Sequence, residues 1–233
     1  MSVIHRTTLE PTKIELLTDW LPGRSWYLGG ADGPLLDRAG GYRLDDPEGA
    51  VGIEFMVVTD VSGPLPVAYQ MPFTYRAAPL EGAEHALVGT TEHGVLGRRW
   101  VYDGAHDPVL VGQLYALLRG TAKAQAQQQS DTLDPTVVVE RVDSPLPPAT
   151  LGTAPVTAAD GPQGAEVRVP AGDGELALRI HRLLRPHPAE ADAPADARAA
   201  DAATGTILAR VTTGWSVPGG TTVRGPFATV LRP

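Results

Sequence analysis

Hydrophobic and polar positions alternate along two stretches in the first half of the chain. Every second residue is apolar or aromatic from Val51 to Val57 and again from Val67 to Tyr75. A period of two is typical of β-strands, whose successive side chains point to opposite faces of a sheet. Turn-forming residues at 62–64 separate the two stretches, so the pattern predicts a β-hairpin. Pro72 has no backbone donor, which predicts that the second strand lies at a sheet edge or is bulged there.

Two other stretches carry apolar residues at helical spacing. The first runs through Leu17 to Leu21 and stops at Pro22. The second opens at Asp107-Pro108, where an aspartate suited to the N-cap position is followed by a proline suited to the first turn. Its apolar stripe comprises Leu110, Leu114, Leu117 and Leu118.

The remaining pattern is strand-rich. We interpret residues 32–48 as a polar loop and expect short strands at Ala86–Thr91 and Arg98–Tyr102 to complete an antiparallel meander. This mixture predicts an α+β fold. Five strands are predicted in the second half, at Thr136–Val142, Ala165–Val169, Glu175–Leu184, Thr206–Thr213 and Phe227–Leu231.

The composition suggests two parts of the 233-residue chain. Residues 1–120 form the first, residues 121–135 read as a linker or a frayed helix, and residues 136–233 form a β-rich antiparallel part. Residues 186–205 are rich in Ala, Asp and Pro and contain no large apolar residue, so we expect a flexible loop there.

Charge and cysteine usage exclude several classes of protein. The formal net charge of −8 disfavours nucleic acids and anionic membranes as partners. The chain has no cysteine, which rules out disulfides and thiol chemistry and suits a reducing cytoplasm. We find neither a signal-peptide pattern nor an apolar run long enough to span a membrane, so we expect a cytoplasmic protein.

The densest set of chemically versatile side chains lies between Gly89 and Pro108. Glu92, His93, His106 and Asp107 are of ligand types that bind divalent metals, but their spacing matches no known metal motif. Asp107 is explained more simply as a helix cap. We therefore predict neither a metal site nor a cofactor.

Arginines and aromatic residues in the same stretch offer a second kind of site. Arg98, Arg99 and Asp103 could bind an anion or a partner's acidic patch, or could form a cross-strand ion pair on a solvated face. Trp26, Tyr27, Trp100 and Tyr102 could stack on a sugar, although aromatic residues of this kind also build sheet cores. No G-x-S-x-G sequence supports a serine hydrolase, and we assign no catalytic residue.

Two segments of the first half resemble a known family. WLPGRSWYLGG (residues 20–30) resembles the opening helix and following stretch of the N-terminal cap subdomain of actinobacterial maltokinases. VYDGAHDPVLVGQLYALL (residues 101–118) resembles the closing strand, Asp-Pro turn and Leu-rich helix of the same cap. The resemblance covers about residues 1–120 and implies a curved antiparallel sheet packed with two helices.

The second half is similar to a truncated kinase N-lobe. GELALRIHRLL (residues 174–184) resembles the strand that carries the ATP-phosphate lysine, with Arg179 at the position of the lysine. A guanidinium does not simply replace an ammonium at such a site. The sequence contains no H-R-D-like loop, D-F-G-like metal motif or phosphate-binding P-loop, so we expect no kinase activity.

Three functions remain open at this point. The first is a non-catalytic binding or regulatory protein related to maltokinase caps, associated with α-glucan or trehalose metabolism, whose partner is a pathway enzyme or kinase. The alternative is a binding protein or enzyme for a sugar, phosphate or nucleotide, with its site around Glu92–Asp107. The third is a pseudokinase-like lobe that binds a nucleotide through Arg179. The metabolic setting comes from the resemblance alone. It stays an expectation because a shared fold does not carry function with it.

Overall fold

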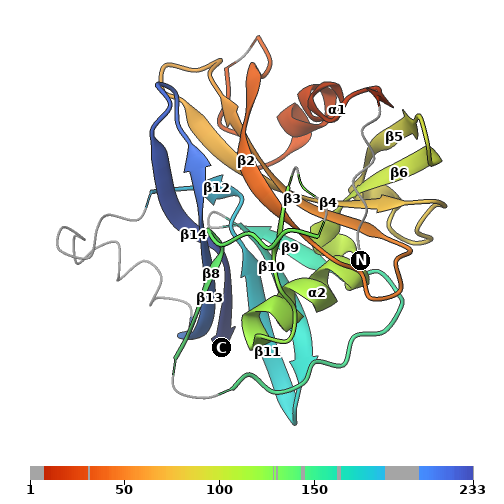
Figure 1. Ribbon diagram of the computed structural model, residues 1–233, viewed down its shortest axis with the longest axis vertical. Coiled ribbons are helices and arrows are strands. Elements are labelled where there is room, and N and C mark those ends of the chain that lie inside the picture. Colours follow the sequence, from red (N-terminus) through yellow and green to blue (C-terminus); the bar gives the residue numbers. More distant parts are fainter. Residues whose placement is uncertain are drawn as a thin grey trace.

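Two antiparallel sheets and two α-helices make up the described part of the chain (Figure 1). The computed structural model describes residues 8–30, 32–127, 129, 131–142, 145–161, 164–186 and 205–232. Every strand pairing among these residues is antiparallel. The predicted α+β fold is therefore confirmed.

The first sheet holds all the strands that the structure describes within residues 1–120. Its strand order is β1-β5-β6-β4-β3-β2-β7, and β12 also pairs with β4. Because β12 comes from the second half of the chain, this sheet joins the two halves. The strands are β1 (Leu9–Glu10), β2 (Leu36–Leu44), β3 (Gly52–Asp60), β4 (Val67–Arg76), β5 (Leu87–His93), β6 (Gly97–Asp103), β7 (Gln125–Ala126) and β12 (Leu183–Leu184).

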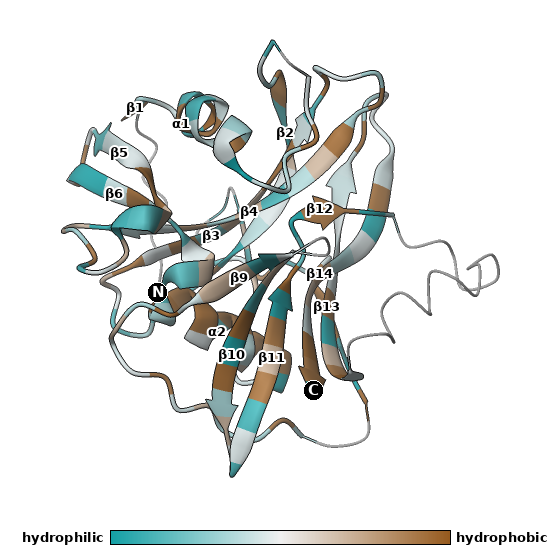
Figure 2. Cartoon of the chain, turned by 180° about the vertical axis from the view of Figure 1, so that it is seen from behind, coloured by the Kyte–Doolittle hydropathy of each residue, from teal (hydrophilic) through white to brown (hydrophobic). Residues whose placement is uncertain are grey.

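The second sheet is built entirely from the second half, in the order β8-β13-β14-β11-β10-β9. Hydrophilic positions interrupt the hydrophobic ones along β10 and β11, as expected for strands with one face in the core (Figure 2). The strands are β8 (Val138–Arg141), β9 (Ala158–Gly161), β10 (Gly164–Ala171), β11 (Gly174–Ile180), β13 (Thr206–Ser216) and β14 (Thr222–Arg232).

Both helices begin at a side-chain cap. Helix α1 (Lys13–Trp20) starts after Thr12, which forms a capping box with Glu15. Helix α2 (Pro108–Arg119) starts after Asp107, whose side chain accepts a hydrogen bond from Val109 N, as the Asp-Pro pair predicts. Short 3-10 helices occupy Leu21–Gly23 (η1), Glu84–Ala86 (η2) and Gly104–His106 (η3). No helix in the described residues is long and apolar enough to cross a membrane.

Helix α2 packs between the two sheets, and α1 covers the opposite face of the first sheet. The four predicted leucines of α2 are buried in the largest core cluster, together with Ile53 and Phe55 of the first sheet and Leu178 and Val230 of the second. Leu17 of α1 belongs to a second cluster with Met56, Tyr69 and Trp26. The first sheet therefore has buried residues on both faces.

The expected polar loop at 32–48 is wrong, because Leu36–Leu44 forms β2, paired with β3. Exposed Asp37 and Arg38 and the Gly40-Gly41 pair hide the strand from a pattern search. The ladder between β2 and β3 is irregular between Arg38 and Gly40. A side chain at Gly41 would place its Cβ 2.1 Å from the Phe55 carbonyl oxygen, so glycine is required by the close approach of β3.

The edge position predicted for the strand that contains Pro72 is also wrong. β4 lies inside the sheet, paired with β3 along its length. On its other side, β12 pairs with residues 68–69 and β6 pairs with residues 73–76. Pro72 falls between these two partners, where a missing backbone donor costs nothing.

Two further predictions concern the linker at residues 121–135 and the loop at residues 186–205. Within residues 121–135 the described residues are not helical and contain β7, which pairs with β2. The predicted division of the chain at this point stays a prediction. The expected flexible loop at 186–205 lies almost wholly outside the described residues. β9 was not anticipated, because its Ala, Asp and Gly residues carry no strand signal.

Candidate functional site

The hairpin of β5 and β6 carries six of the predicted site residues, four of them near its turn. Glu92 lies opposite Arg98, and the two exposed side chains form an ion pair at 2.8 Å. His93 Nδ1 accepts hydrogen bonds from the backbone of the turn at Val95 and Leu96. Arg99 is partly exposed on β6. The Glu92–Arg98 contact is the cross-strand pair on a solvated face that the sequence analysis allows, and such pairs contribute little stability.

Asp103 lies at the opposite end of β6, inside the protein. Its two oxygens accept hydrogen bonds from Arg182 Nη2 at 2.7 and 2.6 Å, and Oδ1 also accepts one from Ala105 N. Arg182 is fully buried, and its guanidinium carbon lies 5.3 Å from the centre of the Trp26 ring. Arg182 of the second half therefore neutralises the Asp103 carboxylate, which is buried and not accessible to a ligand.

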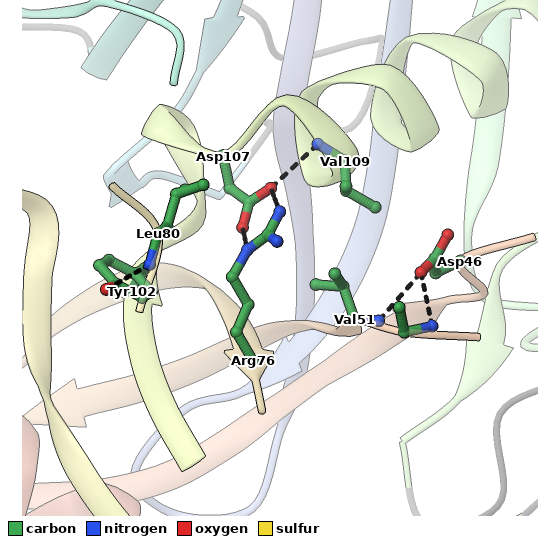
Figure 3. Close-up of polar contacts among 8 residues, drawn as sticks. Asp46, Val51, Arg76, Leu80, Tyr102, Asp107 and Val109 are labelled. Carbon is green, nitrogen blue, oxygen red and sulfur yellow. Dashed lines mark hydrogen bonds and ion pairs between the residues drawn. The ribbon is translucent and has the colours of Figure 1, made fainter. Parts of the chain in front are cut away.

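Asp107 is engaged in a similar way, by an arginine of β4. Arg76 Nε and Nη2 each donate to one oxygen of Asp107 at 2.7 Å, while Asp107 also caps α2 (Figure 3). The hydrogen bond that Arg76 donates to Asp107 outweighs burial and raises the pKa of Arg76. This two-pronged pairing fixes the start of α2 against the first sheet.

The aromatic residues near this end of β6 serve the core. Tyr102 is buried, and its hydroxyl accepts a hydrogen bond from Leu80 N. Trp100 packs partly buried beside it. Trp26 is buried against Tyr69, with ring centres 5.9 Å apart. These contacts agree with the interpretation of the rings as core residues.

The predicted histidine and carboxylate ligands do not gather in one place. The six residue steps from Gly97 to Asp103 in an extended strand put the two ends of β6 about 20 Å apart. Glu92 and His93 lie at one end, while His106 and Asp107 follow the other. The described residues contain no group of three or more His, Cys, Asp or Glu side chains able to hold a metal ion. Instead, His106 meets His85, with Nδ1 and Nε2 separated by 3.2 Å.

Arg179 lies in β11, inside the second sheet. Its side chain is buried, and Nη2 contacts Glu166 of the neighbouring strand at 3.2 Å. Leu178 and Ile180 point into the main core, as the alternation predicts. The ion pair with Glu166 accounts for a buried arginine at this position, and nucleotide binding by Arg179 stays a prediction.

A buried charge network on the α1 side of the first sheet was not predicted. Glu54 accepts hydrogen bonds from Lys13 of α1, Tyr75 of β4 and Gln127 beyond β7. Burial would raise the pKa of Glu54, but the Lys13 charge and these hydrogen bonds outweigh it and lower the pKa to about 2. One signal could have revealed the network, since Glu54 is a charged residue between the apolar Ile53 and Phe55 of a buried strand.

Exposed apolar side chains are carried by segments that meet near the β3–β4 turn, where Val61 N donates a hydrogen bond to Leu35 O and Gly30 N donates one to Ser62 Oγ. We call the exposed residues Leu28, Leu35, Val61 and Leu65 the apolar rim; their exposed fractions are 61, 62, 39 and 75%. Asp60 fastens the segments that carry them by accepting hydrogen bonds from Tyr27 Oη, Leu35 N and Ser62 N. Tyr69 Oη accepts a further bond from Leu28 N.

Comparison with known proteins finds a similarity within the first half of the chain. Residues 20–107 match the family model of the maltokinase N-terminal cap domain. The match spans both the segment that opens with Trp20 and the hairpin of β5 and β6, so this part of the chain is similar to a maltokinase N-terminal cap domain. No curated protein matches the chain.

Proposed function

We propose that this protein is a non-catalytic binding protein that uses its cap-like domain to dock against an enzyme of α-glucan or trehalose metabolism, with a maltokinase-type kinase as the partner. The family name supports a kinase as the partner, because the matched domain is the N-terminal cap of a maltokinase. The observation that carries the proposal is the apolar rim, which lies within the matched residues.

The rim has the properties of a docking surface. Several large apolar side chains exposed together are uncommon on a soluble monomer and mark interaction sites. The hydrogen bonds to Asp60 and Tyr69 hold the rim in place before binding, so little conformational entropy is lost when a partner binds. The carboxylates Asp103 and Asp107, by contrast, are paired internally, which supports a binding role over acid–base chemistry at those positions.

The test is a binding titration of the purified protein with a purified maltokinase, followed by biolayer interferometry. We expect saturable binding that weakens at least tenfold, or about 1.4 kcal/mol, in Leu35→Asp and Leu65→Asp, because each places a charge in the apolar contact. Both positions are exposed, so the variants keep their fold.

Leu133→Asp is the matched control, because Leu133 is also an exposed leucine but lies outside the rim. It should bind the kinase as the wild type does. Absence of binding, or equal weakening by the control, would reject the rim as the docking surface. Maltose phosphorylation by the protein without its partner would reject the non-catalytic role.

A further inference from the structure

We propose that His85 and His106 form a two-histidine binding site for a divalent transition-metal ion of the Zn²⁺ or Ni²⁺ type. The site is independent of the apolar rim and of the proposed docking function. It rests on the position of two imidazole nitrogens that the fold brings together from η2 and η3.

The nitrogen positions fit joint coordination of one ion. Nε2 of His85 and Nδ1 of His106 lie 3.2 Å apart, and the ring planes are inclined at 89°. Zinc binds histidine nitrogen at about 2.0–2.1 Å, so two nitrogens at a tetrahedral angle stand about 3.4 Å apart. The observed separation requires only a small adjustment of the exposed His85 ring.

The fold holds His106 firmly and leaves His85 accessible. His106 lies between Asp103, which caps η3, and Asp107, which caps α2, and its carbonyl accepts a hydrogen bond from Val156 N. Its ring is partly buried, while His85 is exposed. An ion would thus meet one fixed ligand and one adjustable ligand, and water would complete its coordination from the open side.

The surroundings and the chemistry of the pair favour a transition-metal cation. Glu84 interacts electrostatically with His85 and adds negative charge beside the site. Imidazole is a ligand for zinc, nickel and copper, whereas calcium and magnesium prefer oxygen.

The competing explanation is a hydrogen bond between one neutral donor imidazole and one acceptor imidazole. Isothermal titration of the purified protein with ZnCl₂ and NiCl₂ at pH 7.5 separates the two. We expect one equivalent of metal to bind. His85 would be a direct ligand. Because even an outer-shell partner contributes about tenfold to metal affinity, His85→Gln should weaken binding by more than that factor.

His93→Gln is the control. His93 ends β5 and bonds to the β5–β6 turn, at the opposite end of β6 from His106. It should leave metal binding unchanged, and MgCl₂ should produce no binding heat. As a second measurement, ¹⁵N spectra of the imidazoles should show both Nε2 of His85 and Nδ1 of His106 shifting with zinc. If neither metal bound, or if binding were unchanged in His85→Gln, the proposal would be overturned. The hydrogen bond would then be the explanation of the contact between the two rings.

Discussion

Arg182 carries its charge in the interior, where Asp103 neutralises it. Removing one partner of such a pair leaves an uncompensated buried charge, which typically costs about 3–5 kcal/mol. We therefore expect Arg182→Met to lower the free energy of unfolding by about that amount, measured by urea denaturation. Arg182→Met combined with Asp103→Leu should recover part of the loss, because neither charge is then buried.

The exposed pair of Arg98 and Glu92 provides the control for this experiment. Both side chains are more than half exposed, so solvent screens their attraction. Arg98→Ala should cost about 0–1 kcal/mol. Equal costs for the buried and the exposed arginine would contradict the role assigned to Arg182.

The lowered pKa of Glu54 predicts a loss of folding stability at acid pH. Its folded pKa of about 2 lies below the ordinary value of 4.5, so its ionised form stabilises the folded state above pH 4.5. That stability, about 3 kcal/mol, is lost as the pH falls toward 2. Glu54→Gln should be less stable than the wild type at neutral pH but should lose less stability in acid. Urea denaturation at several pH values measures both slopes, and parallel slopes would contradict the depressed pKa.

The sequence was informative about residues whose roles are local. Asp107 was predicted as a helix cap because the cap lies next to the helix it starts. Its pairing with Arg76, 31 residues away, and that of Asp103 with Arg182, 79 residues away, could not be predicted. Such contacts depend on the order of strands in the first sheet, and a local pattern does not contain that order.

The two helix caps differ in what their loss removes. Thr12 is exposed and caps α1, so Thr12→Ala should cost about 1 kcal/mol. Asp107 is buried and also pairs with Arg76, so Asp107→Ala should cost clearly more. Asp107→Asn keeps an oxygen for Val109 N and should fall between them. Thermal unfolding measures the order, and a larger effect at Thr12 would contradict it.

Secondary-structure elements were predicted well where periodicity was strong. β3, β4 and α2 were recognised because burial imposed a regular apolar pattern on them. The pattern does not predict β2, because glycines and exposed charges interrupt it. Gly41 is there because β3 approaches it closely, which a local pattern does not show. Pro72 does not indicate a sheet edge here, because its missing donor falls between β12 and β6, and β12 comes from far along the chain.

Across the whole molecule, aromatic rings connect the two sheets. Tyr42 of β2 stacks on Phe55 of β3 at 4.6 Å and lies 6.0 Å from Phe227 of β14. Phe227 in turn lies 6.0 Å from Trp215 of β13. These rings and α2 belong to one core cluster that includes residues from both halves of the chain. The halves therefore share the burial that stabilises them.

This shared core predicts that the two sheets unfold together, even though the family match ends within the first half. Leu114→Ala, in the helix between the sheets, should cost about 2–5 kcal/mol and shift the whole transition. Far-UV circular dichroism and tryptophan fluorescence should give coincident urea curves, as a single cooperative transition requires. A fragment of residues 1–120 should not fold stably, because it would expose the face of the first sheet that the second half covers. Separate transitions, or a natively folded fragment, would show that the cap-like part is stable without its second half.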